Sequence, residues 1–79
     1  MSAEELYEML QQRPFTPIRL HISNGKTYDI RHPEMAIVAQ SIVTVGLTGD
    51  NGNGRGIARG IIHCSLSHIV QVEPLGVEA

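Results

Sequence analysis

The chain has no tryptophan, one phenylalanine, two tyrosines and a single cysteine. One cysteine excludes an intramolecular disulfide framework and is typical of the reducing cytoplasm, where we expect this protein. So few aromatic rings leave little surface on which bases could stack. No apolar run approaches the length of a membrane span, and the N-terminal residues lack a signal-peptide pattern, so we expect no membrane partner.

The charge of the chain is also small. Its 6 basic and 8 acidic residues give a formal net charge of −2. A dedicated double-stranded DNA binder usually needs a strongly basic face, so only a local basic patch is compatible with this balance. The 79 residues, of which 42% are hydrophobic, predict one globular domain over residues 1–79. A core of this size is marginal, which makes self-association a plausible supplement to stability.

Two short glycine motifs suggest nucleotide or cation binding, but neither is complete. Gly25-Lys26-Thr27 ends like a phosphate-binding loop, yet the loop's first glycine would fall at Leu20, and a strand-like alternation follows. The glycine-rich stretch 46–60 contains no GxGxxG, and no glutamate closes an EF-hand there. We therefore expect no cofactor.

The first dozen residues predict a helix over about residues 2–12. Ser2 and Glu5 have the spacing of a capping box, in which each side chain bonds the other residue's backbone amide. Leu6 and Leu10 lie one turn apart and form an apolar stripe. A helix this short needs tertiary packing to be stable, so we expect it to dock on the rest of the domain.

The turn between the first two strands follows from side-chain register. A two-residue loop would place Leu20 opposite Asp29 and mix apolar and charged faces. A three-residue loop at 23–25 places Leu20 opposite Tyr28 and Arg19 opposite Asp29, with glycine at its left-handed third position. We expect the three-residue loop.

The remaining segments are extended and rich in β-branched residues. A 3₁₀ turn at Ser65-Leu66-Ser67 is expected between the last two strands, because three residues are too few for a long-armed hairpin. The expected strands span about residues 17–22, 26–32, 35–38 together with 41–47, 58–64 and 69–73, and a mobile glycine-rich loop spans 48–56.

This order of elements resembles the Sm-like/SH3-like barrels, in which an N-terminal helix caps five strongly bent strands. The segments LHISNGKTYDI and SHIVQVEPL carry the resemblance. The chain is also similar to a family of small uncharacterised bacterial proteins in RPFTPIRLHISNG, YDIRHPE and HCSLSHIVQVEPL. The resemblance implies a mainly β fold with one N-terminal helix, a small five-stranded strongly bent barrel, and no activity that can be named.

The resemblance does not extend to the Sm RNA pocket. That pocket uses an Asp and an Asn after the bent second strand, where this chain has the apolar run 35–38. It also uses Arg-Gly or Lys-His before the last strand, where this chain has Ser65–Ser67.

The histidines and the cysteine do not form a recognisable catalytic or metal motif. His32 and Glu34 flank a proline as an acid/base pair, but no nucleophile or oxyanion donor is identifiable near them. Neighbouring strand residues such as His63 and Cys64 face opposite sides and cannot chelate together, although His63 and His68 could converge across a turn. We expect no enzyme activity and no bound metal.

We expect a non-enzymatic interaction or regulatory module that binds a protein partner or self-associates through the edge of its last strand, Ile69–Glu73. The alternative is an Sm-like RNA-binding protein that uses a basic outer face. The candidate residues for binding an anion or a partner are Arg19, Lys26, Arg31, Arg55 and Arg59.

Overall fold

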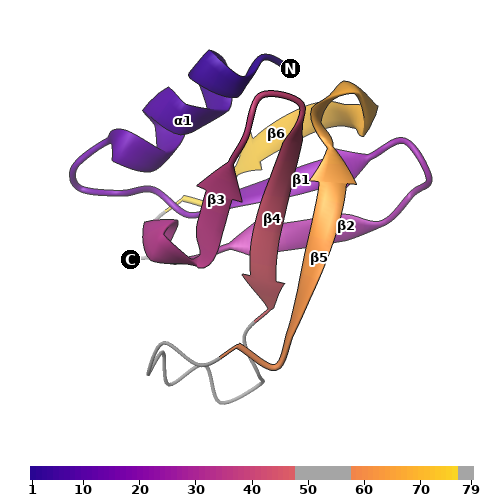
Figure 1. Ribbon diagram of the computed structural model, residues 1–79. Helices are drawn as coiled ribbons and strands as arrows, with labels where there is room; N and C mark the ends of the chain where they lie inside the picture. The colour runs from indigo at the N-terminus through magenta and orange to yellow at the C-terminus, as the bar shows by residue number, and fades with distance from the viewer. Residues whose placement is uncertain (48–57, 77–79) are drawn as a thin grey trace.

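The computed structural model of the chain describes residues 1–47 and 58–76. The glycine-rich loop expected at 48–56 lies outside the described residues. Among them, no helix is long and apolar enough to cross a membrane. Figure 1 shows the elements in chain order: α1 (Ala3–Gln11), β1 (Ile18–Ile22), β2 (Thr27–Ile30), the 3₁₀ turn η1 (Pro33–Met35), β3 (Ala36–Val38), β4 (Ile42–Leu47), β5 (Gly60–Ser65), the 3₁₀ turn η2 (Leu66–His68) and β6 (Ile69–Pro74).

Helix α1 begins with the predicted capping box. The Ser2 hydroxyl accepts a hydrogen bond from the Glu5 amide at 3.1 Å, and the Glu5 carboxylate accepts one from the Ser2 amide at 3.0 Å. The hydrogen bond from the Ser2 backbone lowers the pKa of Glu5. Leu6 and Leu10 are the buried residues of α1. The helix is therefore held in place by its apolar stripe, because nine residues are too few for a stable isolated helix.

The β1–β2 hairpin has the register that side-chain parity predicts. Leu20 lies opposite Tyr28, and Arg19 lies opposite Asp29. Gly25 has φ of 90°, a left-handed conformation that other residues adopt at a cost. The register places the apolar side chains of both strands on the inner face and the charged ones on the outer face.

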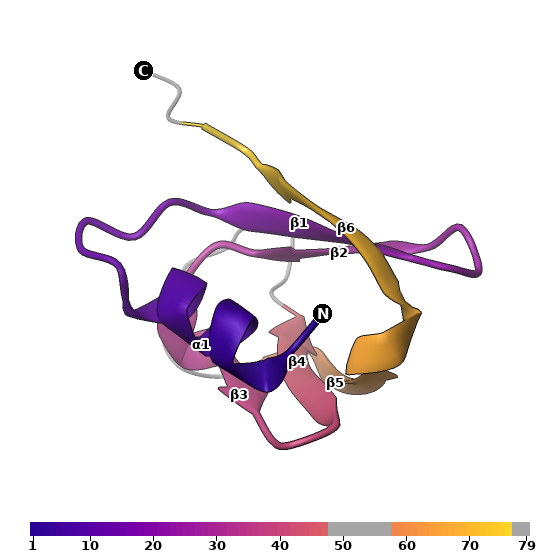
Figure 2. The ribbon, with the colours of Figure 1, turned by 90° about the horizontal axis from the view of Figure 1, so that it is seen from above.

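The strands form two separate antiparallel sheets of three strands each. The first sheet has the order β2–β1–β6, and the second has the order β3–β4–β5. The strands of one sheet run across those of the other in Figure 1, and the two sheets lie as layers in Figure 2. Within residues 1–47 and 58–76 no ladder joins the sheets, so the predicted closed, five-stranded Sm-like/SH3-like barrel is wrong.

The barrel prediction fails because the chain changes sheet through short turns instead of through continuous bent strands. At η1, Pro33 has no amide hydrogen with which to extend the β2 ladder into β3. At η2, three residues in a 3₁₀ turn separate β5 from β6. The segments expected at 35–38 and 41–47 form β3 and β4 of a hairpin, closed by the Ala39 amide donating to the Ile42 carbonyl at 2.8 Å.

The hydrophobic core lies between the two sheets and beneath α1. Its most completely buried side chains are Leu6 from α1, Leu20 from β1, Ile30 from β2, and Val43 and Val45 from β4. No polar or charged side chain is buried in the described part of the chain. Figure 2 shows α1 beside β3, where it covers one side of the space between the layers. The helix is therefore part of the core and not an appendage.

Replacing a core residue of α1 tests this role. Leu6 is 0% exposed and the adjacent Tyr7 is 55% exposed. We expect Leu6→Ala to lower the free energy of unfolding by about 2–5 kcal/mol, because it removes buried methyl groups and leaves a cavity. Tyr7→Ala on the same helix should change it by only about 0.5 kcal/mol. Urea unfolding followed by circular dichroism measures both, and equal losses would contradict docking of α1.

Candidate functional site

The outer face of the first sheet carries a group of charged side chains from three strands. Arg19 of β1 donates two hydrogen bonds to the Asp29 carboxylate of β2, at 2.7 Å and 3.1 Å. Arg31 donates to the same carboxylate at 3.3 Å. His21 Nε2 lies 2.9 Å from the Glu73 carboxylate of β6. The hairpin register produces this arrangement, because it places Arg19 directly opposite Asp29.

The electrostatics of this face follow from the shared carboxylate. Hydrogen bonding from Arg19 is the main cause that lowers the pKa of Asp29, and the charges of both arginines add to it. Hydrogen bonding to Asp29 raises the pKa of Arg19 in turn. Two guanidinium groups and two carboxylates, Asp29 and Glu73, thus occupy one face and largely neutralise each other.

The structure does not gather the five predicted binding residues into one patch. Arg19 and Arg31 lie together and both bond Asp29. Lys26 is exposed at the exit of the hairpin turn. Arg59 is exposed just before β5, on the other sheet. Arg55 lies outside the described residues.

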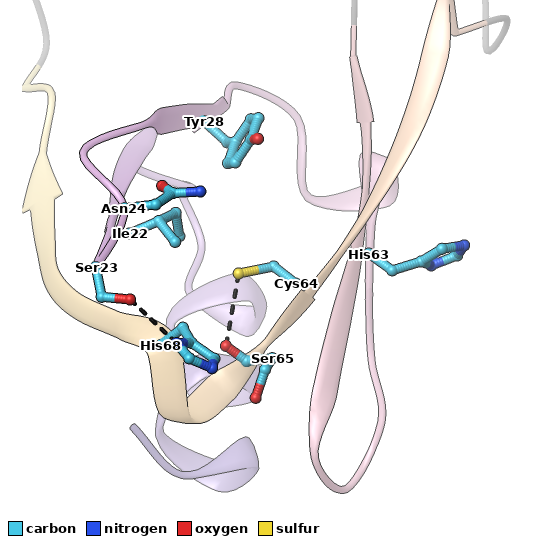
Figure 3. Close-up of a pocket in the computed structure, with 8 residues that line it drawn as sticks. All are labelled: Ile22, Ser23, Asn24, Tyr28, His63, Cys64, Ser65 and His68. Carbon is cyan, nitrogen blue, oxygen red and sulfur yellow. Dashed lines mark hydrogen bonds between the residues drawn. The ribbon is translucent and has the colours of Figure 1, made fainter.

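A cavity of about 370 Å³ lies between the tip of the β1–β2 hairpin and the end of β5 (Figure 3). Its upper and left walls in Figure 3 come from the hairpin, and its lower and right walls come from β5 and η2. The residues that line it are Ile22, Ser23, Asn24, Tyr28, His63, Cys64, Ser65 and His68.

Several polar groups around the cavity bond to each other. Ser23 Oγ lies 3.0 Å from His68 Nδ1, which links the hairpin to η2. The Asn24 side-chain oxygen accepts a hydrogen bond from the Lys26 amide at 2.9 Å. The Cys64 thiol donates to the Ser65 carbonyl at 3.5 Å, and burial raises the pKa of this thiol. Its protonated form is therefore favoured, which makes Cys64 a weak nucleophile.

The two histidines near the cavity do not act together. His63 points away from the other lining residues in Figure 3, and its Nδ1 lies 2.8 Å from Thr44 Oγ1 on the outer face of the second sheet. His68 instead bonds Ser23. No three His, Cys, Asp or Glu side chains within the described ranges are placed to hold a metal ion. The cavity is bordered by hydrogen-bonding groups of the hairpin, β5 and η2.

The outer face of the second sheet carries exposed isoleucines around the polar pair Thr44–His63, in contrast to the charged side chains of the first sheet. Ile37, Thr44 and His63 lie side by side across the three strands. In the neighbouring rows of the same face, Ile42 lies on one side of them and Ile61 on the other. Ile37 is 70% exposed, Ile61 63% and Ile42 38%. We call these three residues the isoleucine face.

Sequence reasoning missed the isoleucine face, although a signal was present. The pairs Ile37-Val38, Ile42-Val43 and Ile61-Ile62 place two apolar residues in succession on a strand. Because successive side chains point to opposite faces, each pair puts one apolar group into the core and one outside. Such doublets indicate a sheet that is apolar on both faces.

Comparison of the chain with protein-family models, with curated proteins and with solved structures gave no match. The similarity to small bacterial proteins therefore stays a prediction.

The pH dependence of stability tests the ion pairs of Asp29. A lowered folded-state pKa means that these pairs contribute stability above the unfolded pKa of about 3.9 and lose it as the pH falls further. At pH 7 we expect Asp29→Asn to cost about 1 kcal/mol or less, because the pair is partly exposed. Urea unfolding should show this difference shrinking below about pH 4.

Glu34→Gln is the control for Asp29→Asn, since Glu34 is an exposed carboxylate in η1. A difference between wild type and Asp29→Asn that grows toward low pH would contradict the assigned direction of the pKa shift.

Proposed function

We propose that this protein is a non-enzymatic interaction module that self-associates through the isoleucine face. The observation that carries the proposal is the contrast between the two sheets. The first sheet turns mutually paired charges outward, whereas the second turns Ile37, Ile42 and Ile61 outward. Thr44 and His63 lie among the three isoleucines, and exposed apolar side chains gathered on one face of a small domain are typical of an interaction site.

The composition of the second sheet's outer face favours a second copy of the chain as the partner. Within β3, β4 and β5 its outward positions are Ile37, Ile42, Thr44, Gly46, Ile61, His63 and Ser65, none of which is Asp, Glu, Lys or Arg, and the exposed Arg59 lies just before β5. The core of a homodimer interface is more apolar than other interfaces and is depleted of charged residues. A two-fold axis through the face would bring the same patch of both copies together, as the interface of a closed dimer requires.

The edge of β6 gives less support to self-association than the isoleucine face. β6 is an edge strand, and Val70 on it is 65% exposed. However, β6 ends in Pro74, which has no amide hydrogen, and Glu73 is engaged with His21. Proline and charged residues on an edge strand discourage pairing with another strand.

The alternative of RNA binding also receives less support. Arg19 and Arg31 both bond Asp29, so an RNA phosphate would compete with a carboxylate for them. Arg59 lies on a different sheet. We place the module in the cytoplasm, because its single cysteine is typical of a reducing compartment.

A charge on the isoleucine face should abolish self-association. We expect Ile61→Lys to raise the dimer dissociation constant by about tenfold or more, because it buries an unpaired ammonium group in an apolar interface. Val70→Lys is the matched control, with nearly equal exposure at 65% against 63%, and should leave association unchanged. Sedimentation velocity over a range of protein concentrations measures both.

Two results would contradict the proposal. One is a wild-type chain that stays monomeric at about 1 mM, a concentration at which even weak specific dimers form. The other is dissociation by Val70→Lys with no effect of Ile61→Lys, which would move the interface to β6.

A further inference from the structure

The outer edge of β5 presents backbone groups that no other strand of the described residues uses. The Leu66 amide donates to the Ser41 carbonyl at 2.9 Å, and Cys64 and Ile62 lie opposite Val43 and Val45. In an antiparallel pair, hydrogen-bonded and non-hydrogen-bonded positions alternate. The backbone groups of Cys64 and Ile62 therefore bond β4. The amides and carbonyls of Ile61, His63 and Ser65 point away from β4. In the described part of the chain, β5 is the last strand of its sheet on this side.

β5 is also the least protected of the edge strands in the described ranges. β3 has only three residues. β2 carries the ion-paired Asp29, and β6 carries Glu73 and Pro74. β5 has six residues, Gly60–Ser65, and none of them is proline, lysine, arginine or a carboxylate. Natural edges are usually blunted by such residues, so an edge without them is suited to accept another strand.

The cavity in Figure 3 lies directly along this edge. His63, Cys64 and Ser65 of β5 border it, and Tyr28 and Asn24 of the hairpin face them across it. Side chains of an extended segment alternate between its two faces. A segment paired with β5 would therefore direct alternate side chains into a cavity of about 370 Å³, which is large enough to hold one of them.

Hydrogen-bonding groups of the hairpin and of η2 line the cavity, and none of the lining side chains is a carboxylate. The Asn24 side-chain oxygen already accepts a hydrogen bond from the Lys26 amide, so the NH₂ group of Asn24 is the part that can bond a ligand. Figure 3 shows this NH₂ group directed into the cavity. His68 uses Nδ1 for Ser23, which leaves Nε2, and the Tyr28 hydroxyl adds a third group. Although the chain has a net charge of −2, no Asp or Glu lines this cavity.

We propose that β5 accepts an extended, acidic segment of a partner protein, which pairs with the strand edge and places one Asp or Glu side chain in the cavity. The inference rests on the proposed function in treating the chain as an interaction module, but it concerns a different surface from the isoleucine face. A second copy pairing β5 to β5 does not fit as well, because β5 itself carries no carboxylate to fill the cavity.

The direct test is a titration with a defined peptide, followed by the amide resonances of the ¹⁵N-labelled full chain. The probe is acetyl-Thr-Val-Glu-Val-Thr-amide. We expect shifts at His63 and Ser65 and at the Asn24 side-chain NH₂. The same peptide with Gln in place of Glu should bind about tenfold more weakly, because it loses charge-assisted hydrogen bonds. The same peptide with Pro in place of both Val residues should not bind, because proline removes the strand donors.

A charge substitution in the cavity separates recognition of the acid from backbone pairing. Asn24→Asp keeps an oxygen for the Lys26 amide and therefore preserves the turn. It should weaken binding of the Glu peptide by about tenfold and leave the Gln peptide unchanged. Gln71→Glu adds the same charge on β6, away from the residues that line the cavity, and should change neither affinity.

The outcomes of this titration are separable from those for self-association. The absence of shifts at His63 and Ser65 up to about 5 mM Glu peptide, or equal affinities for the Glu and Gln peptides, would overturn the inference. A chain that dimerises but shows no such shifts would retain the proposed function and lose this inference. A monomeric chain that binds the Glu peptide selectively would support the inference and overturn the isoleucine-face dimer.

Discussion

The two 3₁₀ turns, η1 and η2, are the constraint on which the rest of the structure depends. Each one ends the hydrogen-bond ladder of a strand in one sheet and starts a strand in the other. Because Pro33 has no amide hydrogen, β2 cannot run on into β3 as a single bent strand. The described part of the chain thus builds two three-stranded sheets around one core instead of a closed barrel, and η2 ends β5 beside the cavity.

The two sheets share a core but present opposite chemistry to their surroundings. In the first sheet, register brings Arg19, Arg31 and Asp29 together, so these charges pair with each other. In the second, the apolar doublets leave Ile37 and Ile61 in water after the core has been filled. Exposed apolar area favours association because burying it is worth roughly 25 cal/mol per Å². This difference is the support for the proposed interaction role of the second sheet.

Local features of the fold were predictable because local chemistry decides them. The capping box of Ser2 and Glu5 and the left-handed Gly25 each depend on a few neighbouring residues. The hairpin register was predictable because a one-residue slip would turn charged side chains into the core. Barrel closure was not, since it depends on whether ladders form between strands that are distant in sequence. The binding residues were grouped by sign of charge, and that grouping could not show that Arg19 and Arg31 share one carboxylate.

The sequence by itself determined the helix, the first hairpin and the alternation that separates charged from apolar positions in it, because these follow from spacing over a few residues. Only the tertiary structure decided that the strands divide into two sheets and that the cavity forms between Asn24 and Ser65. It also brought Ile37 and Ile61 onto one face. These features join residues that are far apart in the chain, and their positions depend on how the sheets pack against the shared core.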